Sequence, residues 1–424
     1  MGKIFRGGAL LENMKAEGRR QKAEVRRRRA TLFSKFCLLP SAFCLHVFLT
    51  ACTTVPRITL PNDPSIWFLL VEDDNGRVLY SQNANERYVP ASNRKLFAAA
   101  TIANCLGLET RLHTQIRREG EDLVIVGDGD PSLGSWRYER TEDFNGIADL
   151  LLRRGVTRVR DVIADVSAFD RVTIPGSWKV GNLGSDYSAP VDAITWGESE
   201  IPTDRAVPDP GLHAANAMRD ALVSRGIAVT GTTRVNTERR AWNGEMIADL
   251  PSPFVVQLLT TVLKNSHNLY TEMLFKRASN GTYDASFALE RAFATREAGV
   301  LADDFRFMDG SGLSPDDLVT PRAVIDVLRW MNHPSRRGIW WSLLAQPANE
   351  GTLRKRLLTL EHRLRGKTGT INGVAALSGI IAMPDGRYRY FSIAVNHDSG
   401  DGDEAVKVID SIVETIAGTT PRTK

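Results

Sequence analysis

The side chains best suited to chemistry in this sequence fall in three short motifs. These are a Ser-x-x-Lys (Ser92, Lys95), a Ser-x-Asn (Ser266, Asn268) and a Lys-Thr-Gly that begins at Lys367. The first and the last occur once each in the chain. Each motif alone is weak evidence, but together they provide a nucleophile, a base and a cation, which are the groups that serine acyl transfer requires.

Ser92 and Lys95 are expected to share one face of a helix. Residues three apart in a helix lie on the same side, so the amine reaches the hydroxyl. A serine at a helix N-terminus also lies where backbone N–H groups favour developing negative charge. Lys95 lies in an apolar run, and a nearby ammonium from Lys367 would disfavour its charged form. Both effects should lower the pKa of Lys95 toward that of a general base.

Lys367 and Thr368 are predicted to lie on an edge strand. There they could bind a substrate carboxylate while the N–H groups of the strand pair with the substrate backbone. The motifs therefore indicate a serine acyl-transfer site for a peptide with a free carboxyl terminus. Taken singly, they also fit a surface Ser/Lys pair, a solvated helical Ser-His-Asn and a hairpin Lys-Thr-Gly, but their joint occurrence favours acyl transfer.

The elements that must position these motifs follow from the sequence pattern. A β-hairpin is predicted over residues 67–81, because two strand-like runs flank Asp74-Asn75-Gly76 and Asn-Gly tolerates positive φ. Residues 92–106 are apolar almost all round, which predicts a buried helix that Gly107 ends. The tail predicts strands at 363–371, 375–383 and 388–396 and a helix at 403–417.

The middle of the chain predicts an α/β module. Strands are expected at 123–126, 159–164 and 229–235, with helices at 144–154 and 212–225, and from 251 the chain is expected to be helical through 276. Antiparallel strands with helices at both chain ends predict a split domain, 63–112 with 250–424, into which 113–249 is inserted. The expected fold class is therefore α/β (α+β), an antiparallel sheet flanked by helices with an inserted α/β domain.

These motifs and elements resemble those of the penicillin-binding protein and serine β-lactamase superfamily. More narrowly, the chain resembles the class C low-molecular-mass penicillin-binding proteins, the D-alanyl-D-alanine carboxypeptidase/endopeptidase group of peptidase S13 type. The resemblance covers nearly all of residues 62–420. It rests on the three motifs and on the segments 89–91, 127–131, 187–191, 266–272, 309–314, 351–353 and 366–370.

The resemblance implies a role for each catalytic residue. Ser92 would be the nucleophile, and Lys95 would be the base that activates it. Ser266 would relay the proton to the leaving amine, with electrostatic support from Lys367. Asn268 would hold the substrate amide and orient Lys95.

The resemblance also implies how substrate is bound. Thr368 and Thr370 would bind the terminal carboxylate, with Gly369 between them in the same substrate-binding strand. The N–H groups of Ser92 and Thr370 would form an oxyanion hole. Asp165 would face the amine of the substrate side chain from the inserted domain.

Two departures from the family concern the approach of substrate. In the family a further small domain follows the Tyr-x-Ala-Pro-Val segment, whereas here only residues 196–207 separate that segment from the next predicted helix. That domain is therefore expected to be absent. Where relatives commonly carry Arg after Ser-Gly-Leu-Ser, this chain has Pro315. Both changes bear on substrate preference rather than on acyl chemistry.

The charge of the chain is unevenly distributed. Its 424 residues carry 54 Lys+Arg and 50 Asp+Glu, a formal net charge of +4. Residues 1–51 hold eleven basic and three acidic residues, a net of +8, which leaves 43 and 47, a net of −4, for the rest. A basic stretch before an apolar one at 36–51 predicts a secretory signal, because this interrupted apolar stretch is shorter than the roughly 20 residues of a spanning helix. The basicity therefore indicates export and no nucleic-acid partner.

The apolar stretch ends in Leu49-Thr50-Ala51-Cys52, which resembles the lipobox of bacterial lipoproteins. The resemblance implies that Cys52 is diacylated and becomes the new N-terminus, followed by a tether over 52–62. The protein would then be exported to the periplasm and attached to a membrane by this lipid anchor. An uncleaved signal anchor and ordinary cleavage nearby are the alternatives.

The remaining residues predict neither a metal site nor a cofactor. The sequence has no Cys-x-x-Cys and no His-Glu-x-x-His, and its seven histidines are scattered. Cys105 is the one cysteine beyond the leader and lipobox, so the mature chain cannot form an internal disulfide. Because it lies in an apolar run, we expect Cys105 to be buried.

Three functional hypotheses follow. The leading one is a lipid-anchored hydrolase that cleaves D-Ala-D-Ala termini or D-Ala–diamino-acid crosslinks in peptidoglycan stem peptides and is inhibited by β-lactams. The second is a β-lactamase or a D-amino-acid peptidase or esterase on the same fold, which differs in how fast water removes the acyl group. The third is a slow wall-binding or β-lactam-sensing lipoprotein, against which the presence of both Ser92 and Lys95 argues.

Overall fold

The computed structural model describes residues 58–139, 143–201, 204–398, 400 and 402–418. All of these described residues belong to one compact unit. The predicted leader and Cys52 lie outside the described residues. Within the described ranges, no helix has the length and hydropathy that crossing a membrane requires.

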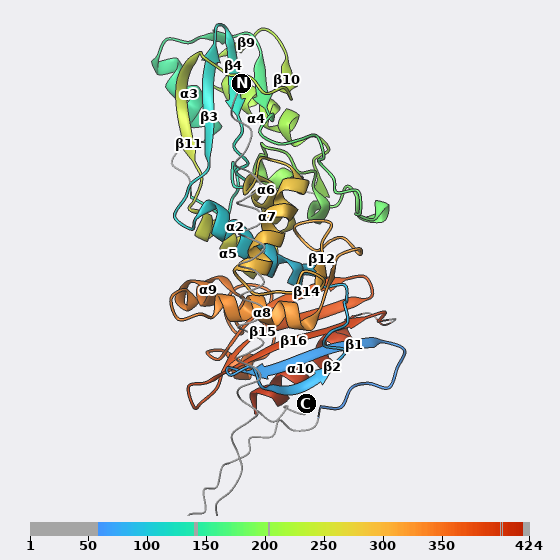
Figure 1. Cartoon of the computed structure of the whole chain (residues 1–424). Helices are drawn as coiled ribbons and strands as arrows, with labels where there is room; N and C mark the ends of the chain where they lie inside the picture. The colour runs from blue at the N-terminus through green and yellow to red at the C-terminus, as the bar shows by residue number, and fades with distance from the viewer. Residues whose placement is uncertain (1–57, 140–142, 202–203, 399, 401, 419–424) are drawn as a thin grey trace, which may run out of the picture. The chain divides into compact units, whose positions relative to one another are not determined.

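A five-stranded antiparallel sheet combines strands from both ends of the chain (Figure 1). β1 pairs with β16 from Ile66, opposite Asn396, to Asp73, opposite Arg389. The predicted hairpin and the three predicted tail strands are confirmed, and they all belong to this one sheet. The strand order is β14-β15-β16-β1-β2, with β1 at Ile66–Asp73, β2 at Val78–Gln82, β14 at Leu364–Ile371, β15 at Val374–Ala382 and β16 at Tyr388–Asn396.

Both faces of this sheet are covered, which explains why β1 is apolar without interruption. Phe68 and Leu70 pack into a core that includes residues of α2, α5, α7 and α8. Leu69 and Val71 point to the opposite face and pack against α10. The bounds of these helices are α2 Lys95–Leu106, α5 Val255–Lys264, α7 Tyr283–Arg296, α8 Pro321–Met331 and α10 Asp403–Ala417.

A second sheet is mixed and has the order β10-β6-β4-β3-β11. Strands β10, β6 and β4 run parallel, whereas β3 and β11 run antiparallel to their neighbours. The sheet shares its core with α3 and α4 and with two residues of the later helix that begins at Asn268. The expected α/β module is thus confirmed, while its boundaries at 113 and 249 stay a prediction. The bounds are β3 His113–Glu119, β4 Asp122–Val126, β6 Val162–Asp165, β10 Thr233–Asn236, β11 Glu245–Pro251, α3 Phe144–Arg153 and α4 Pro210–Ser224.

Two helices, not one, follow residue 251. α5 ends at Lys264 and α6 spans Asn268–Arg277. Between them Ser266 has a φ of 63°, a left-handed conformation that interrupts a right-handed helix. The expectation of continuous helix through 276 is therefore wrong here, and the Ser-x-Asn motif lies at a break between helices.

Short elements complete the described chain: β5 Arg158–Val159, β7 Glu200–Ile201, β8 Arg205–Ala206, β9 Ala228–Val229, β12 Phe305–Arg306, β13 Leu318–Val319, α9 Arg337–Leu343 and 3₁₀ turns such as η1 Ala91–Arg94 and η4 Gly197–Ser199.

Cys105 is exposed, so the expectation that it is buried is wrong. α2 is fully buried from Lys95 to Ile102, but its last turn extends beyond the core, and Asn104 is exposed there as well. An apolar run predicts burial only while the helix has neighbours on all sides.

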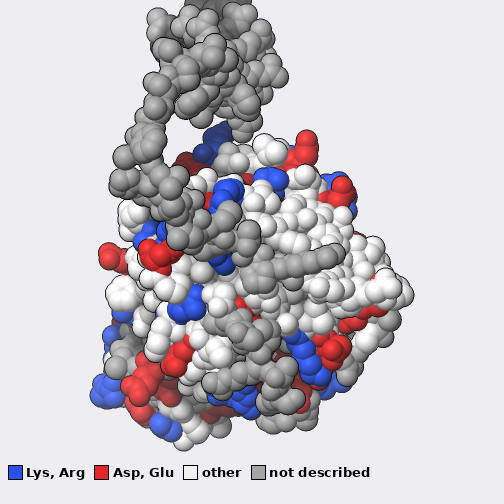
Figure 2. All heavy atoms as spheres, turned by 90° about the horizontal axis from the view of Figure 1, so that it is seen from below, with Lys and Arg blue, Asp and Glu red and all other residues white. Residues whose placement is uncertain are grey.

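Charged side chains of both signs are intermixed on the face shown in Figure 2. Where that face is drawn in colour, Lys and Arg alternate with Asp and Glu among larger areas of other residues. The visible part therefore presents mixed charge rather than a continuous basic or acidic patch.

A buried ion pair ties the beginning of α2 to α7. The two terminal nitrogens of Arg94 bond the two carboxylate oxygens of Glu290 at 2.5 and 2.9 Å, and both side chains are essentially unexposed. The Nε of Arg94 donates to the backbone oxygen of Asp309 at 2.9 Å, and its guanidinium lies 4.0 Å from the centre of the Phe307 ring. Arg94 thus joins three segments around the residue that follows it, Lys95.

We expect Glu290→Ala to lower the free energy of unfolding by about 3–5 kcal/mol, because it leaves a buried guanidinium without its carboxylate. Urea denaturation followed by circular dichroism measures this change. Leu289→Ala, on the more exposed face of the same helix, is the matched control and should change it by less than about 0.5 kcal/mol. Equal losses in the two variants would contradict the importance of the pair.

Candidate active site

A cavity of about 470 Å³ brings the three motifs together. Lys95 and Lys367 lie beside it with no exposed surface. A concave site with converging polar groups is where ligand binding is expected. The cavity is lined by Ser92, Ser266, Asn268 and Thr370 from the motifs and by Lys179, Asn182, Tyr187, Gly312, Leu313, Ile371 and Asn372.

Ser92 lies in η1, a single 3₁₀ turn that runs directly into α2. Its Oγ is 2.9 Å from the Nζ of Lys95, as predicted from their spacing. The turn is tightly packed, because a Cβ on Gly312 would lie 2.0 Å from the backbone oxygen of Ala91. Ala91 itself has a φ of 47°, so the backbone immediately before the serine is held in a strained conformation.

The amine of Lys95 is the centre of the site. Besides Ser92, its Nζ bonds the Oδ1 of Asn268 at 2.6 Å and the backbone oxygen of Ser311 at 2.7 Å. Burial lowers the pKa of Lys95 to about 7, although the carboxylates of Asp309 and Glu272 raise it. A large fraction of this amine is therefore neutral at neutral pH and able to accept a proton.

Lys367 connects the strand motif to the helix break. Its Nζ donates to the Oγ of Ser266 at 2.8 Å and to the backbone oxygen of Thr368 at 2.7 Å. Burial and then the charge of Lys95 lower the pKa of Lys367 well below its usual value. The expected repulsion between the two amines thus acts on Lys367, whereas the cation that lowers the pKa of Lys95 is Arg94.

Asn268 is the first residue of α6 and enters the site because of the helix break. Its Oδ1 accepts from Lys95, and its Nδ2 donates to the backbone oxygen of Tyr187 at 2.7 Å. The side chain therefore holds the amine in place and ties α6 to the segment that carries Tyr187.

β14 is the outermost strand of the main sheet. The N–H and C=O of Gly366 bond Ala345, on the side away from β15. Because backbone groups alternate along a strand, those of Thr368 and Thr370 point to that same side. The Oγ1 of Thr368 also donates to the Oγ1 of Thr352 at 2.8 Å. This edge offers N–H and C=O groups to an extended peptide.

Gly369 lets β14 approach the serine closely. A Cβ at this position would lie 2.7 Å from the backbone oxygen of Pro90 and 3.1 Å from the backbone nitrogen of Ser92. No side chain fits that gap, which explains the glycine of Lys-Thr-Gly in physical terms. The strand edge and the backbone N–H of Ser92 are thereby brought to one place.

A loop formed by residues 309–314 presents the Ser311 carbonyl to Lys95. Buried Glu272 of α6 holds this loop by accepting from the N–H groups of Gly310 and Ser311 at 2.7–3.0 Å. Burial and the charge of the neighbouring Asp309 together raise the pKa of Glu272 to about 7. Sequence reasoning assigned no role to these residues, although both segments belong to those that carried the family resemblance.

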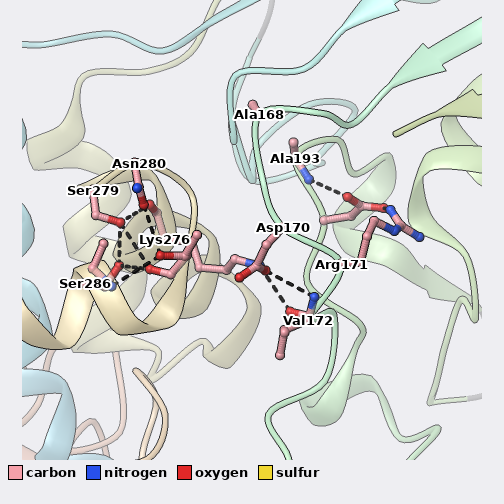
Figure 3. A network of polar contacts seen from close by, with 12 residues as sticks. Ala168, Asp170, Arg171, Val172, Ala193, Lys276, Ser279, Asn280 and Ser286 are labelled. Atoms are coloured by element: carbon pink, nitrogen blue, oxygen red, sulfur yellow. Dashed lines mark hydrogen bonds and ion pairs between the residues drawn. The ribbon is translucent and has the colours of Figure 1, made fainter. Parts of the chain in front are cut away.

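The segment between the second sheet and the cavity is anchored at two points. Figure 3 shows Lys276 of α6 reaching Asp170, with distances of 2.6 Å to its Oδ1 and 3.1 Å to the backbone oxygen of Val172. Farther along, the Nε1 of Trp178 donates to Asp309 at 2.8 Å. Both anchors lie shortly before the cavity-lining residues of this segment, which begin at Lys179, and tie the segment to α6 and to the 309–314 loop.

Asp165 does not lie in this cavity. It ends β6, is buried, and lines a separate cavity of the second sheet. Its carboxylate accepts from the backbone N–H of Ser167 at 2.9 Å, from the Nδ2 of Asn236 at 3.1 Å and from the Nε1 of Trp242. The other predicted site residues of the described chain lie around Ser92. Asp165 instead stabilises the end of β6 through these hydrogen bonds.

Among the described residues, one group could hold a metal ion: Glu198, Glu200 and His267, whose ligand atoms lie within 4.8 Å of one another. The Glu198 carboxylate already accepts from the Nε of Arg137 at 2.9 Å and from the hydroxyl of Tyr270 at 3.0 Å. Arg137 thus supplies the positive charge that a metal would bring, and the group forms an ion-pair cluster.

Comparison with known structures relates this fold to penicillin-binding proteins. The structure of penicillin-binding protein 4 from Haemophilus influenzae superimposes with a TM-score of 0.73 at 17% identity, covering 84% of this chain and 97% of that one. A predatory endopeptidase from Bdellovibrio bacteriovorus, solved in its penicillin G acylated form, gives 0.56 at 16% identity, covering 85% and 95%. The predicted fold class is thereby confirmed.

Sequence comparison leads to the same group. A D-alanyl-D-alanine carboxypeptidase from Actinomadura sp. is 28% identical over 433 residues, covering 80% of this chain and 79% of the relative. The model of the D-Ala-D-Ala carboxypeptidase 3 (S13) family matches residues 64–202 and 198–416, which is most of the sequence. With the motifs converging on one cavity and this match across both sheets, the chain belongs to the D-Ala-D-Ala carboxypeptidase 3 (S13) family.

Proposed function

We propose that this chain is a serine D-Ala-D-Ala carboxypeptidase/endopeptidase that acts on peptidoglycan stem peptides through an acyl-enzyme on Ser92. The observation that carries this proposal is the 2.9 Å contact between the Oγ of Ser92 and the buried amine of Lys95, whose pKa is about 7. A neutral amine at that distance can remove the hydroxyl proton as the oxygen attacks.

In acylation, the Oγ of Ser92 attacks the carbonyl carbon of the scissile bond, and its proton passes to the Nζ of Lys95. The N–H groups of Ser92 and Thr370 stabilise the negative oxygen of the tetrahedral intermediate. The C–N bond then breaks, and the proton reaches the leaving amine through the Oγ of Ser266, which Lys367 contacts at 2.8 Å. The terminal D-Ala departs, and the rest of the peptide remains as an ester on Ser92.

In deacylation, water attacks the ester carbonyl and gives its proton to Lys95, which returns a proton to the Ser92 oxygen as the ester bond breaks. A β-lactam acylates the same oxygen when its ring opens, but the amine stays attached to the acyl group. The penicillin G acylated endopeptidase from Bdellovibrio bacteriovorus supports this reaction for a protein of the same fold.

Substrate binding is assigned to the β14 edge. The hydroxyls of Thr368 and Thr370 suit a terminal carboxylate, while the strand backbone pairs with the peptide. A bound carboxylate near Lys367 would in turn favour the charged form of its amine. Gly369 keeps this edge against Ser92. The same geometry suits a carboxylated β-lactam.

We also propose that the additional small domain of the family is absent. The match to the family model falls into two pieces that meet at residues 198–202, inside the short connection 196–207. The break in the match at this connection supports the absence of that domain. Without it, substrate would reach the site differently from the way it does in relatives, and Pro315 would contribute to that difference.

Cell-wall activity places the protein outside the cytoplasm, and the lipobox-like sequence before Cys52 supports attachment to a membrane by acylation of that cysteine. The described residues begin only at Ile58, so this anchor is proposed from the sequence. It would hold the enzyme near its peptidoglycan substrate.

We expect fluorescent penicillin to label the wild-type protein covalently and Ser92→Ala not at all, because the variant has no oxygen to acylate. Labelling is read on a denaturing gel. Ser81→Ala, at an exposed serine of a second Ser-x-Asn, is the control and should label like the wild type. A wild type that fails to label, or a Ser92→Ala that labels equally, would refute the acyl-serine assignment.

The rate constant of acylation should rise about tenfold per pH unit below pH 7 and level off above it. Lys95 is an effective base only when neutral, and its pKa of about 7 means that it becomes protonated, and inactive, as the pH falls. Stopped-flow acylation across pH 5–9 tests this profile. Lys95→Arg should lose about 10²–10⁴-fold at every pH, because guanidinium keeps its proton. The exposed Lys407→Arg is the matched control, and a flat profile in the wild type would contradict the assignment.

Cys52→Ser should shift the protein from the membrane fraction to the soluble fraction of expressing cells and abolish incorporation of labelled palmitate. Cys105→Ser, which removes the exposed cysteine of α2, should change neither result. Membrane association and palmitate labelling that survive in Cys52→Ser would rule out the proposed anchor.

A further inference from the structure

The Ser266–Asn268 turn is supported from behind by a buried pair that none of the motifs predicts. His267, the middle residue of the turn, places its Nε2 3.1 Å from the Oε2 of Glu198. The His267 side chain is 11% exposed and that of Glu198 is not exposed at all. His267 is also not among the cavity-lining residues, so it points away from the site that its two neighbours enter.

Glu198 is the centre of a set of donors. Its carboxylate accepts from the Oγ of Ser135 at 2.5 Å, from the Nε of Arg137 at 2.9 Å and from the hydroxyl of Tyr270 at 3.0 Å, in addition to His267. Burial raises the pKa of Glu198, but the bond and charge of His267 and the other donors outweigh it and bring the pKa to about 2. The carboxylate is therefore an anion that four side chains hold in one position.

The backbone that delivers Glu198 is strained. Gly197, Glu198 and Ser199 have φ values of 60°, 62° and 55°, three left-handed residues in a row, two of which are not glycine. Ser199 is buried, and its Oγ bonds the Oγ1 of Thr195 at 2.6 Å. Such conformations persist only where surrounding contacts impose them, and they concentrate at functional sites.

The pair connects two strained turns. One turn is formed by residues 197–199. The other contains Ser266, which is left-handed with a φ of 63°, and it leads directly into α6. The His267 ring packs on Tyr270 of α6 with ring centres 4.6 Å apart, and Tyr270 also bonds Glu198. Glu198 thus contacts both the turn itself and the first helical turn that follows it.

We propose that Glu198 is a positioning residue for acylation. Through His267 and Tyr270 it fixes the left-handed Ser266 and the beginning of α6, and so sets the Ser266 hydroxyl and the Asn268 side chain relative to their lysines. The role rests on the proposed function, because it assigns Glu198 to the alignment of those catalytic groups. Glu198 belongs to the short connection 196–207, which in this chain therefore acts as a support for the catalytic turn.

The test compares Glu198→Gln, His267→Leu and the double variant in the full-length protein, with acylation by penicillin followed at saturating and subsaturating concentrations. Each single variant should lower the limiting acylation rate constant about 10- to 100-fold, as expected for misaligned groups, and leave the dissociation constant of the initial complex within about twofold. Because His267 acts through its contact with Glu198, the double variant should lose no more than the worse single variant.

Two matched variants serve as controls. His267→Gln keeps an N–H donor for Glu198 and should recover most of the wild-type rate, a rescue that a general loss of packing would not give. Glu200→Gln removes the second carboxylate near His267, which lies 3.8 Å away and is partly exposed, and should leave the rate unchanged.

Distinct outcomes separate failure of this inference from failure of the proposed function. A wild type that is not acylated refutes the proposed function. An acylated wild type whose single variants react within twofold of it overturns the positioning role, and so does a double variant whose loss is the product of the two single losses. Should Glu198→Gln fail to fold in a thermal scan, equal rates for His267→Leu and His267→Gln would overturn the proposal.

Discussion

The active site depends on one buried amine. Lys95 has no exposed surface, and its Nζ is surrounded by oxygens of Ser92, Asn268 and Ser311, which belong to three separate segments of the chain. Burial disfavours the ammonium, while the carboxylates of Asp309 and Glu272 favour it, so the amine is balanced between its two states near neutral pH. Each segment must be held firmly for that balance to persist.

Backbone geometry provides much of this rigidity. Two glycines close the gaps around the serine, Gly369 against Pro90 and Gly312 against Ala91, where any side chain would collide with backbone atoms. Ala91 and Ser266 add left-handed conformations immediately beside the reacting groups. Local preference is thus overridden at the catalytic turns, as expected where a site rather than stability dictates the conformation.

These features also explain what the sequence could predict. Ser92, Lys95 and Lys367 were predictable because their spacing on a helix and a strand is a local property, and the main sheet was predictable from its long apolar runs. The helix break at Ser266 was not, because the apolar residues on the two sides of the polar run 264–268 keep a spacing that one continuous helix would also give. Glu198 lies in an irregular connection with no pattern to mark it, and its importance depends on contacts with Arg137 and Tyr270 that only the folded chain creates.

The pairing of β1 with β16 has a consequence for how the enzyme comes into being. The serine follows the first hairpin, whereas the strand that must pack against it and the β16 strand that links the two are made near the end of synthesis. Such distant pairing forms slowly, since a long loop must close first. A growing chain therefore carries Ser92 in an inert state, without the neighbours that make it reactive, and activity arises only once the last strands have joined the sheet.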